Sequence, residues 1–85
     1  MLLDRLRDLP REVGRVLLIG HNDGIGEFAA GLAGHGKATV LAAVREKYPT
    51  GALATLAAPI EHWPDLAFET AELLAFVRPR DLIGI

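Results

Sequence analysis

The chain has 85 residues, 51% of them hydrophobic and 24% charged, which is the composition of one small globular domain over residues 1–85. A formal net charge of -2 without a basic run gives no electrostatic footprint for nucleic acid or an anionic membrane surface. The absence of cysteine excludes disulfides, zinc-thiolate sites and thiol catalysis. No apolar run approaches the roughly 20 residues of a membrane span, and the N-terminus lacks a signal-peptide pattern. These features predict a cytoplasmic protein.

The first part of the sequence predicts a helix, a strand and a second helix. Leucines at helical spacing in residues 2–9 alternate with charged residues, which predicts a short amphipathic helix ended by Pro10. The unbroken aliphatic run "RVLLIG", residues 15–20, is typical of a strand covered on both faces, as in a parallel α/β sheet. A helical pattern then begins at Gly24 and is predicted to stop at the Gly-His-Gly of residues 34–36.

The second part of the sequence predicts one helix and two strands. The pattern "ATVLAAVREKY", residues 38–48, is helical until Pro49 breaks it. The short apolar runs "GALATLAA" at 51–58 and "ELLAFVRP" at 72–79 are typical of strands, and residues 59–70 are predicted to form a loop between them. This order of elements fits part of an α/β layered fold. A sheet of so few strands leaves exposed edges, and the chain therefore looks like half of a larger fold.

A histidine stands at the junction between the first predicted strand and the helix that follows it. Ligands of open α/β sheets bind beyond the carboxyl ends of the strands, where His21 directly follows Gly20. The next helix points free backbone N–H groups and the positive end of its dipole to the same place, which favours an anion such as phosphate. In the alternative interpretation His21 is a polar turn residue, and Asn22 or Asp23 caps the helix.

A dinucleotide-binding motif competes with the phosphate interpretation. Gly24, Gly26 and Ala29 match the G-x-G-x-x-A spacing, and Glu46 lies about 20 residues further along, as that motif requires. However, three residues separate the predicted strand from the first glycine. Glu46 also falls within a helical pattern rather than at the end of a strand. The sequence therefore favours a phosphate site over a dinucleotide site.

The remaining conspicuous side chains are predicted to have structural roles. Arg78 follows the last strand, where Asp81 offers a salt-bridge partner. Thr50 is predicted to lie in a turn, and Trp63 to anchor its loop by packing. His35 is expected to be an exposed residue at a helix end. The three histidines of the chain follow no metal-ligand spacing.

Three ordered segments resemble the histidine phosphatase superfamily, in particular its small bacterial phosphohistidine phosphatases. The stretch "RVLLIGHNDGIGEFAAGLAG", residues 15–34, is similar to the second-histidine region, where a hydrophobic strand ends in Gly-His-Asn before a helix. The stretches "KYPTGALATL" at 47–56 and "LLAFVRPRDL" at 73–82 are similar to the later strand segments of that family. The resemblance implies a partial three-layer α/β/α phosphoglycerate mutase-like fold with a small, mostly parallel sheet, equivalent to the C-terminal half of such a phosphatase.

The resemblance also implies phosphoryl transfer through a covalent phosphohistidine, without a metal or an organic cofactor, on a phosphorylated protein or a small phosphomonoester. The second histidine of the family corresponds to His21, which with Asn22 would bind the phosphoryl oxygens. The nucleophilic histidine belongs to an Arg-His-Gly motif that this chain lacks, and Asp23 replaces the usual proline. The chain alone is therefore expected to be an inactive half of a hydrolase. The alternative is a non-catalytic module that binds phosphate or self-associates through an exposed sheet edge.

Overall fold

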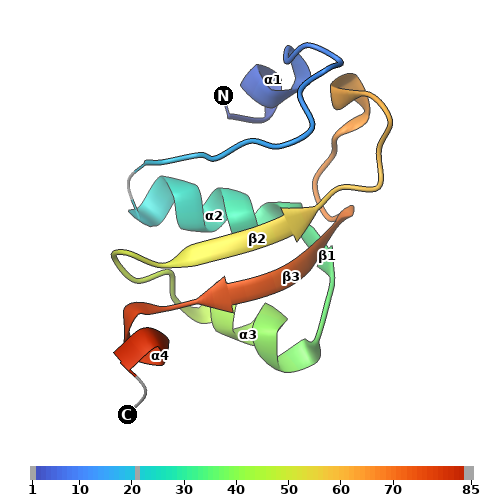
Figure 1. Ribbon diagram of the computed structural model, residues 1–85. Helices are drawn as coiled ribbons and strands as arrows, with labels where there is room; N and C mark the ends of the chain where they lie inside the picture. The colour runs from blue at the N-terminus through green and yellow to red at the C-terminus, as the bar shows by residue number, and fades with distance from the viewer. Residues whose placement is uncertain (1, 21, 84–85) are drawn as a thin grey trace.

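The computed structural model describes residues 2–20 and 22–83, in which short helices alternate with the strands of a single small sheet (Figure 1). The elements of this part of the chain are α1 Leu2–Arg7, α2 Asn22–Leu32, β1 Ala33–His35, α3 Ala38–Glu46, β2 Leu53–Ala57, the 3-10 helix η1 Trp63–Asp65, β3 Ala71–Val77 and α4 Pro79–Ile83. None of these helices is long and apolar enough to cross a membrane.

Strand β3 is the centre of a three-stranded sheet with the order β1-β3-β2. It runs parallel to β1, with Ala33 opposite Ala71. It runs antiparallel to β2, with an irregularity in register after Thr55. The sheet is therefore mixed, and the expectation of a mostly parallel sheet is wrong, because a single parallel pair is formed.

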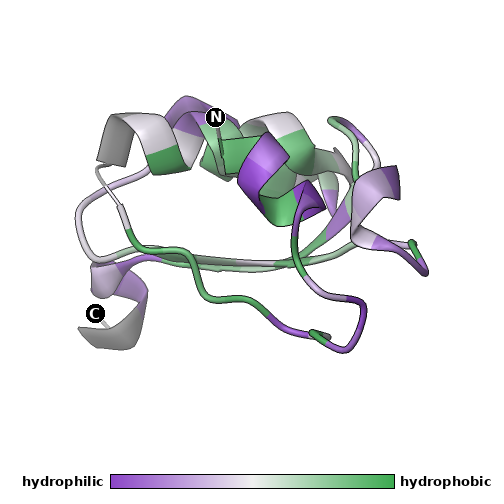
Figure 2. Cartoon of the chain, turned by 90° about the horizontal axis from the view of Figure 1, so that it is seen from above, coloured by the Kyte–Doolittle hydropathy of each residue, from purple (hydrophilic) through white to green (hydrophobic). Residues whose placement is uncertain are grey.

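The core lies between the sheet and helices α2 and α3, which cover the same face of the sheet (Figures 1 and 2). This first cluster contains Ala29, Ala33, Val44 and Leu73, with Val40, Leu41, Tyr48, Ala54, Leu56 and Phe76 packed around it. A second cluster joins α1 to α2 and to the loop around η1, and contains Leu3, Leu6, Phe28, Leu32, Leu66 and Ala71. On the opposite face of the sheet, Leu53 is 50% exposed and Leu74 is 55% exposed. The described chain thus forms two layers, with one bare sheet face.

The aliphatic run at residues 15–20 is not a strand, so that prediction is wrong. The run is a coil that crosses the domain from α1 towards the amino end of α2 (Figure 1). Within the described residues, no backbone hydrogen bond involves residues 14–20. An aliphatic run favours extended backbone and burial, but a strand also requires a neighbouring strand in register. Strand β2, the edge strand on one side of the sheet, bonds only to β3.

The sheet contains one strand that the sequence did not predict. This strand, β1, lies at residues that were predicted to end a helix. Helix α2 does end at Leu32, but the chain continues directly into β1, parallel to β3. The N–H of Glu69 donates to the carbonyl oxygen of Gly31 at 2.8 Å, which holds the segment before β3 against the end of α2. His35 consequently lies on a strand, although it is exposed as expected.

The other predicted elements are confirmed. The leucine-rich N-terminal helix, the helix before Pro49 and the strands near residues 51–58 and 72–79 correspond to α1, α3, β2 and β3. The loop between β2 and β3 contains η1, and Trp63 anchors it as predicted. Its indole Nε1–H donates to the carbonyl oxygen of Val13 at 2.8 Å, and its ring packs against the second cluster.

Candidate functional site

The predicted phosphate site lies at the amino end of α2. His21 and the side chain of Asn22 lie outside the described residues, whereas the backbone of Asn22 begins α2. This end of α2 lies at the same end of the domain as the carboxyl end of β3 and the loop between α3 and β2 (Figure 1). It is the end of the sheet at which α/β proteins commonly bind ligands.

A tight turn closes the α3–β2 loop at this end of the domain. The N–H of Ala52 donates to the carbonyl oxygen of Pro49 at 3.1 Å, and Gly51 has a φ of 81°, a left-handed conformation that glycine adopts without strain. A Cβ at Gly51 would lie 3.3 Å from Cγ of Pro79, so the turn lies against the start of α4. The predicted turn around Thr50 is confirmed.

Arg78 is bound to Asp81, as the sequence predicted. Its Nε lies 3.1 Å from Oδ2 and its Nη2 lies 3.2 Å from Oδ1, and its backbone N–H donates to Oδ2 at 2.8 Å. The guanidinium and the carboxylate thus form a two-pronged pair at the start of α4. This geometry commits Arg78 to Asp81 and lowers the pKa of the Asp81 carboxyl, chiefly through the side-chain hydrogen bond.

We expect Asp81 to titrate below the ordinary aspartate pKa of 3.8. Because the pKa is lower in the folded chain, the pair stabilises the fold above the pKa of the unfolded chain. That contribution is lost as the pH falls through the lower folded value. The chemical shift of the Asp81 carboxyl carbon, followed by NMR as a function of pH, measures this pKa. Arg78→Gln should return the pKa towards 3.8, whereas Arg80→Gln should change it little; an equal response to both variants would contradict the pairing.

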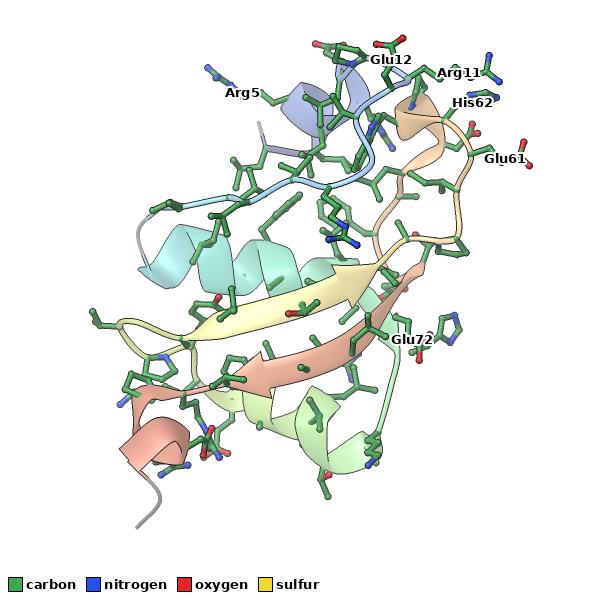
Figure 3. The ribbon with its side chains drawn as sticks, in the orientation of Figure 1. Arg5, Arg11, Glu12, Glu61, His62 and Glu72 are labelled. Carbon is green, nitrogen blue, oxygen red and sulfur yellow. The ribbon has the colours of Figure 1, made fainter. Side chains whose placement is uncertain are left out.

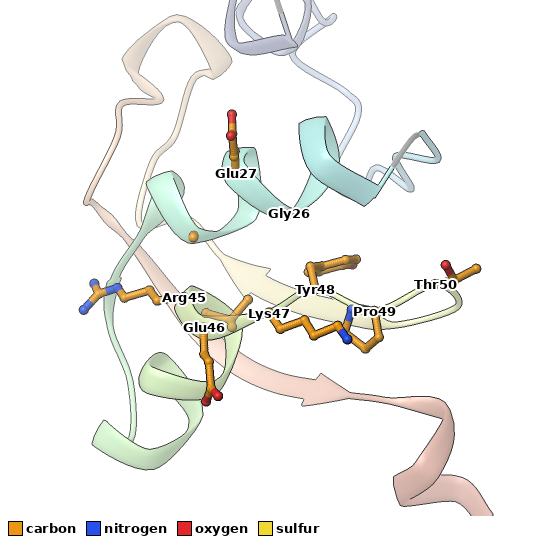
Figure 4. Close-up of a pocket in the computed structure, with 10 residues that line it drawn as sticks. Gly26, Glu27, Arg45, Glu46, Lys47, Tyr48, Pro49 and Thr50 are labelled. Carbon is orange, nitrogen blue, oxygen red and sulfur yellow. The ribbon is translucent and has the colours of Figure 1, made fainter.

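A hollow of about 510 Å³ is lined by residues of α2, of the end of α3 and of the loop that follows α3 (Figure 4). Its lining residues are Gly26, Glu27, Ala30, Val44, Arg45, Glu46, Lys47, Tyr48, Pro49 and Thr50. Two acidic and two basic side chains cancel in charge, and those of Arg45 and Glu46 point away from Tyr48. Arg45 donates to the carbonyl oxygen of Ala33 at 3.2 Å, and the Tyr48 hydroxyl donates to that of Ala52 at 3.2 Å. These polar groups hold the backbone in place.

The glycine spacing of the dinucleotide motif has a packing explanation. A Cβ at Gly26 would lie 2.6 Å from Cβ of Tyr48, so this position lets α2 approach Tyr48 in the loop after α3. A Cβ at Gly24 would meet no other part of the chain within 4 Å. Glu46 is the last residue of α3 and not the end of a strand. The structure therefore offers the motif neither the strand nor the acidic residue position that a dinucleotide requires.

The two described histidines, His35 and His62, lie outside α2 and the segment that precedes it. His35 is opposite Glu72 in the β1–β3 register and lines a smaller hollow of about 290 Å³. His62 precedes η1, where Figure 3 places it near Glu61 and Arg11, with side chains of both charge signs directed outward. No group of three histidine or acidic side chains in the described ranges could hold a metal ion.

The feature that sequence reasoning did not single out is the exposure of the aliphatic segment. Leu17 is 72% exposed and Ile19 is 88% exposed. Its signal was present in the sequence as an uninterrupted apolar run, but the run was interpreted as a buried strand. Comparison of the chain with protein-family models, curated proteins and solved structures gives no match.

Proposed function

We propose that the chain is the phosphate-recognising half of a histidine phosphatase of the phosphohistidine phosphatase type. The observation that carries the proposal is the resemblance of three segments in the same order, at residues 15–34, 47–56 and 73–82. The first segment contains α2, and the other two contain most of β2 and β3. The bare sheet face opposite α2 and α3 also supports it, because the three-layer fold of that family would cover this face.

The chemistry follows from the position of His21 between Gly20 and the first residue of α2. The free N–H groups at the start of α2, together with its dipole, attract an anion there. His21 and Asn22 then donate hydrogen bonds to the phosphoryl oxygens and stabilise the charge that builds up in the transition state, a contribution of about 3–4 kcal/mol. Asp23 opposes the anion, which weakens the site.

The nucleophile comes from outside this chain in the proposed reaction. A histidine nitrogen attacks phosphorus, the alcohol or histidine leaving group departs with a proton, and water then hydrolyses the phosphohistidine to release phosphate. The sequence contains no Arg-His-Gly motif to supply that nitrogen. The chain therefore supplies binding and charge stabilisation, and a second polypeptide segment supplies the attacking group.

We expect the purified chain to bind inorganic phosphate at the backbone N–H groups of residues 22–25 and to leave p-nitrophenyl phosphate and a phosphohistidine peptide intact. NMR titration measures the binding, and phosphate release measures the hydrolysis. His21→Ala should weaken binding at least about tenfold, because a hydrogen bond to a charged group is worth about 1.5–3 kcal/mol.

His35→Ala is the matched control, since His35 is exposed on β1. It should leave phosphate binding unchanged. Equal binding by the wild type and His21→Ala would refute the site. Hydrolysis that His21→Ala abolishes would show that this chain contains its own nucleophile, and the proposed division into two halves would be wrong.

A further inference from the structure

The segment between α1 and α2 makes its last backbone hydrogen bond at Val13. The carbonyl oxygen of Val13 accepts from the indole N–H of Trp63 at 2.8 Å. Beyond it, within the described part of the chain, residues 14–20 make no backbone hydrogen bond and cross the domain as a coil towards α2 (Figure 1). Arg15 lies at the start of this coil and is exposed, as are the residues on either side of it. The peptide bond between Arg15 and Val16 is therefore open to solvent on an unpaired backbone.

An exposed and unpaired backbone is what an endopeptidase needs in a folded substrate. Nicking of native proteins is decided by the burial and the hydrogen bonding of the backbone around the bond that is cut. Extended segments are bound through main-chain hydrogen bonds, which residues 14–20 have available. The side chain of Arg15 adds selectivity, because trypsin-like enzymes carry an aspartate in the pocket that binds the residue before the cut bond.

Most of the other basic residues are protected by regular structure or by proline. Four of them lie inside helices, namely Arg5, Arg7, Arg45 and Arg80. Arg78 precedes Pro79, whose ring removes the N–H group and fixes the backbone after the arginine. An endopeptidase has to unwind a helix before it can bind the first four, and it meets a proline at the fifth.

The three basic residues that remain lie beside backbone hydrogen bonds. Lys37 and Lys47 border α3, and each makes a backbone hydrogen bond to a residue of that helix. Arg11 lies in a turn that is closed by a backbone hydrogen bond of 3.1 Å. Binding at these positions requires such bonds to break, whereas residues 14–20 have none to break. Arg15 is therefore the basic residue at which the folded chain is most accessible to cleavage.

We propose that the bond between Arg15 and Val16 is a processing site for an endopeptidase with an acidic specificity pocket, and that the cut chain stays assembled. The oxygen of a water molecule joins the carbonyl carbon of Arg15, which becomes a carboxylate. The C–N bond breaks, and the two hydrogens of the water go to the nitrogen of Val16, which becomes an ammonium group. The inference does not rest on the phosphate site, because Arg15 is assigned no role in phosphate binding.

The amino-terminal fragment keeps its contacts with the domain after the cut. Leu3 and Leu6 are buried in the second cluster, at 5% and 7% exposure. Nε of Arg7 donates to the carbonyl oxygen of Leu66 at 2.9 Å. The hydrogen bond at Val13 also lies on the amino side of the cut. Apolar burial and two hydrogen bonds thus hold this fragment to the part of the chain that contains α2 and the whole sheet.

Limited digestion of the full chain with trypsin, followed over time by mass spectrometry, tests the site. Residues 1–15 and 16–85 should appear first, with this cut at least about ten times faster than any other, because it needs no unfolding. Arg15→Gln should abolish the first cut. Arg11→Gln is the matched control, since Arg11 is also exposed, and should leave it unchanged. Circular dichroism verifies that both variants are folded. A first cut elsewhere, or cuts within α1 and α3 at a comparable rate, would overturn the site.

Size-exclusion chromatography of the cut protein, after the trypsin is inhibited, tests whether it stays assembled. At micromolar concentration residues 1–15 should elute with residues 16–85 in native buffer and should separate from them in concentrated urea. Mass spectrometry of the fractions identifies both fragments. Separation in native buffer would show that the contacts of α1 do not hold the fragment, and the proposed assembly of the cut chain would be wrong.

Discussion

Gly34→Ala is expected to unfold the domain or to destabilise it severely. Gly34 is the middle residue of β1, and a Cβ at this position would overlap the carbonyl group of Glu69. The overlap is with backbone atoms, so no change of side-chain rotamer can relieve it. The methyl group must push β1 away from the segment that leads into β3.

The segment at Glu69 cannot move aside without further loss. Its N–H donates to the carbonyl oxygen of Gly31 at 2.8 Å, and its own φ of 63° is left-handed, which few non-glycine residues adopt. Displacement would break this bond and the β1–β3 pairing together. We expect a loss of at least about 3 kcal/mol, against roughly 4–13 kcal/mol of total stability for a chain of this length.

Urea unfolding at a fixed protein concentration, followed by circular dichroism, measures the loss. Gly24→Ala is the matched control: Gly24 lies in α2 and is exposed, and a Cβ added there would meet no atom within 4 Å beyond its own helix turn and chain neighbours. Alanine has the higher helix propensity, so this variant should be as stable as the wild type or up to about 1 kcal/mol more stable. Wild-type stability of Gly34→Ala would contradict the close approach of β1 to Glu69.

The elements that the sequence predicted correctly have signals that are local in the chain. The helix α3 combines apolar residues at helical spacing with a terminating Pro49, and β2 and β3 are short apolar runs between turn residues. The pair of Arg78 and Asp81 is likewise local, because the two residues are three positions apart at the start of one helix. In each case the residues that determine the structure are neighbours in sequence.

The elements that were predicted wrongly depend on contacts between distant residues. Strand β1 is only three residues long, Ala-Gly-His, and lacks the β-branched or aromatic residues of a strand. It forms because Gly34 permits close approach to Glu69, which a local pattern does not report. The run at residues 15–20 has strand composition, but no strand of the sheet pairs with it. Its composition predicted the extended backbone and not the partner.

The candidate site also contains one feature that the sequence predicted from neighbouring residues and others that the structure does not test. The start of α2 at Asn22 lies within two residues of the helix start predicted at Gly24, because the junction is encoded by neighbouring residues. The roles of His21 and Asn22 stay predictions, since those side chains lie outside the described residues.

Leu73→Ala is expected to cost about 3–4 kcal/mol, because Leu73 fills the centre of the first cluster. It lies on β3, the strand that holds the sheet together, and is only 3% exposed. Two of the buried residues around it, Ala29 and Ala33, are small and cannot expand into the space that a lost isobutyl group leaves. Truncation therefore removes buried apolar surface and leaves a cavity, and both effects lower the free energy of unfolding.

The neighbouring Leu74 provides a control within the same strand. It points to the bare face of the sheet and is 55% exposed, so Leu74→Ala should cost less than about 1 kcal/mol. Chemical denaturation of the two variants at the same protein concentration compares them, with the dependence on denaturant checked to be unchanged. Leu73 is paired with Leu56 of β2, whereas Leu74 falls at the irregularity in register, and the gap between their losses chiefly measures how much of each side chain the fold buries. Equal losses would show that the face carrying Leu74 is covered in solution.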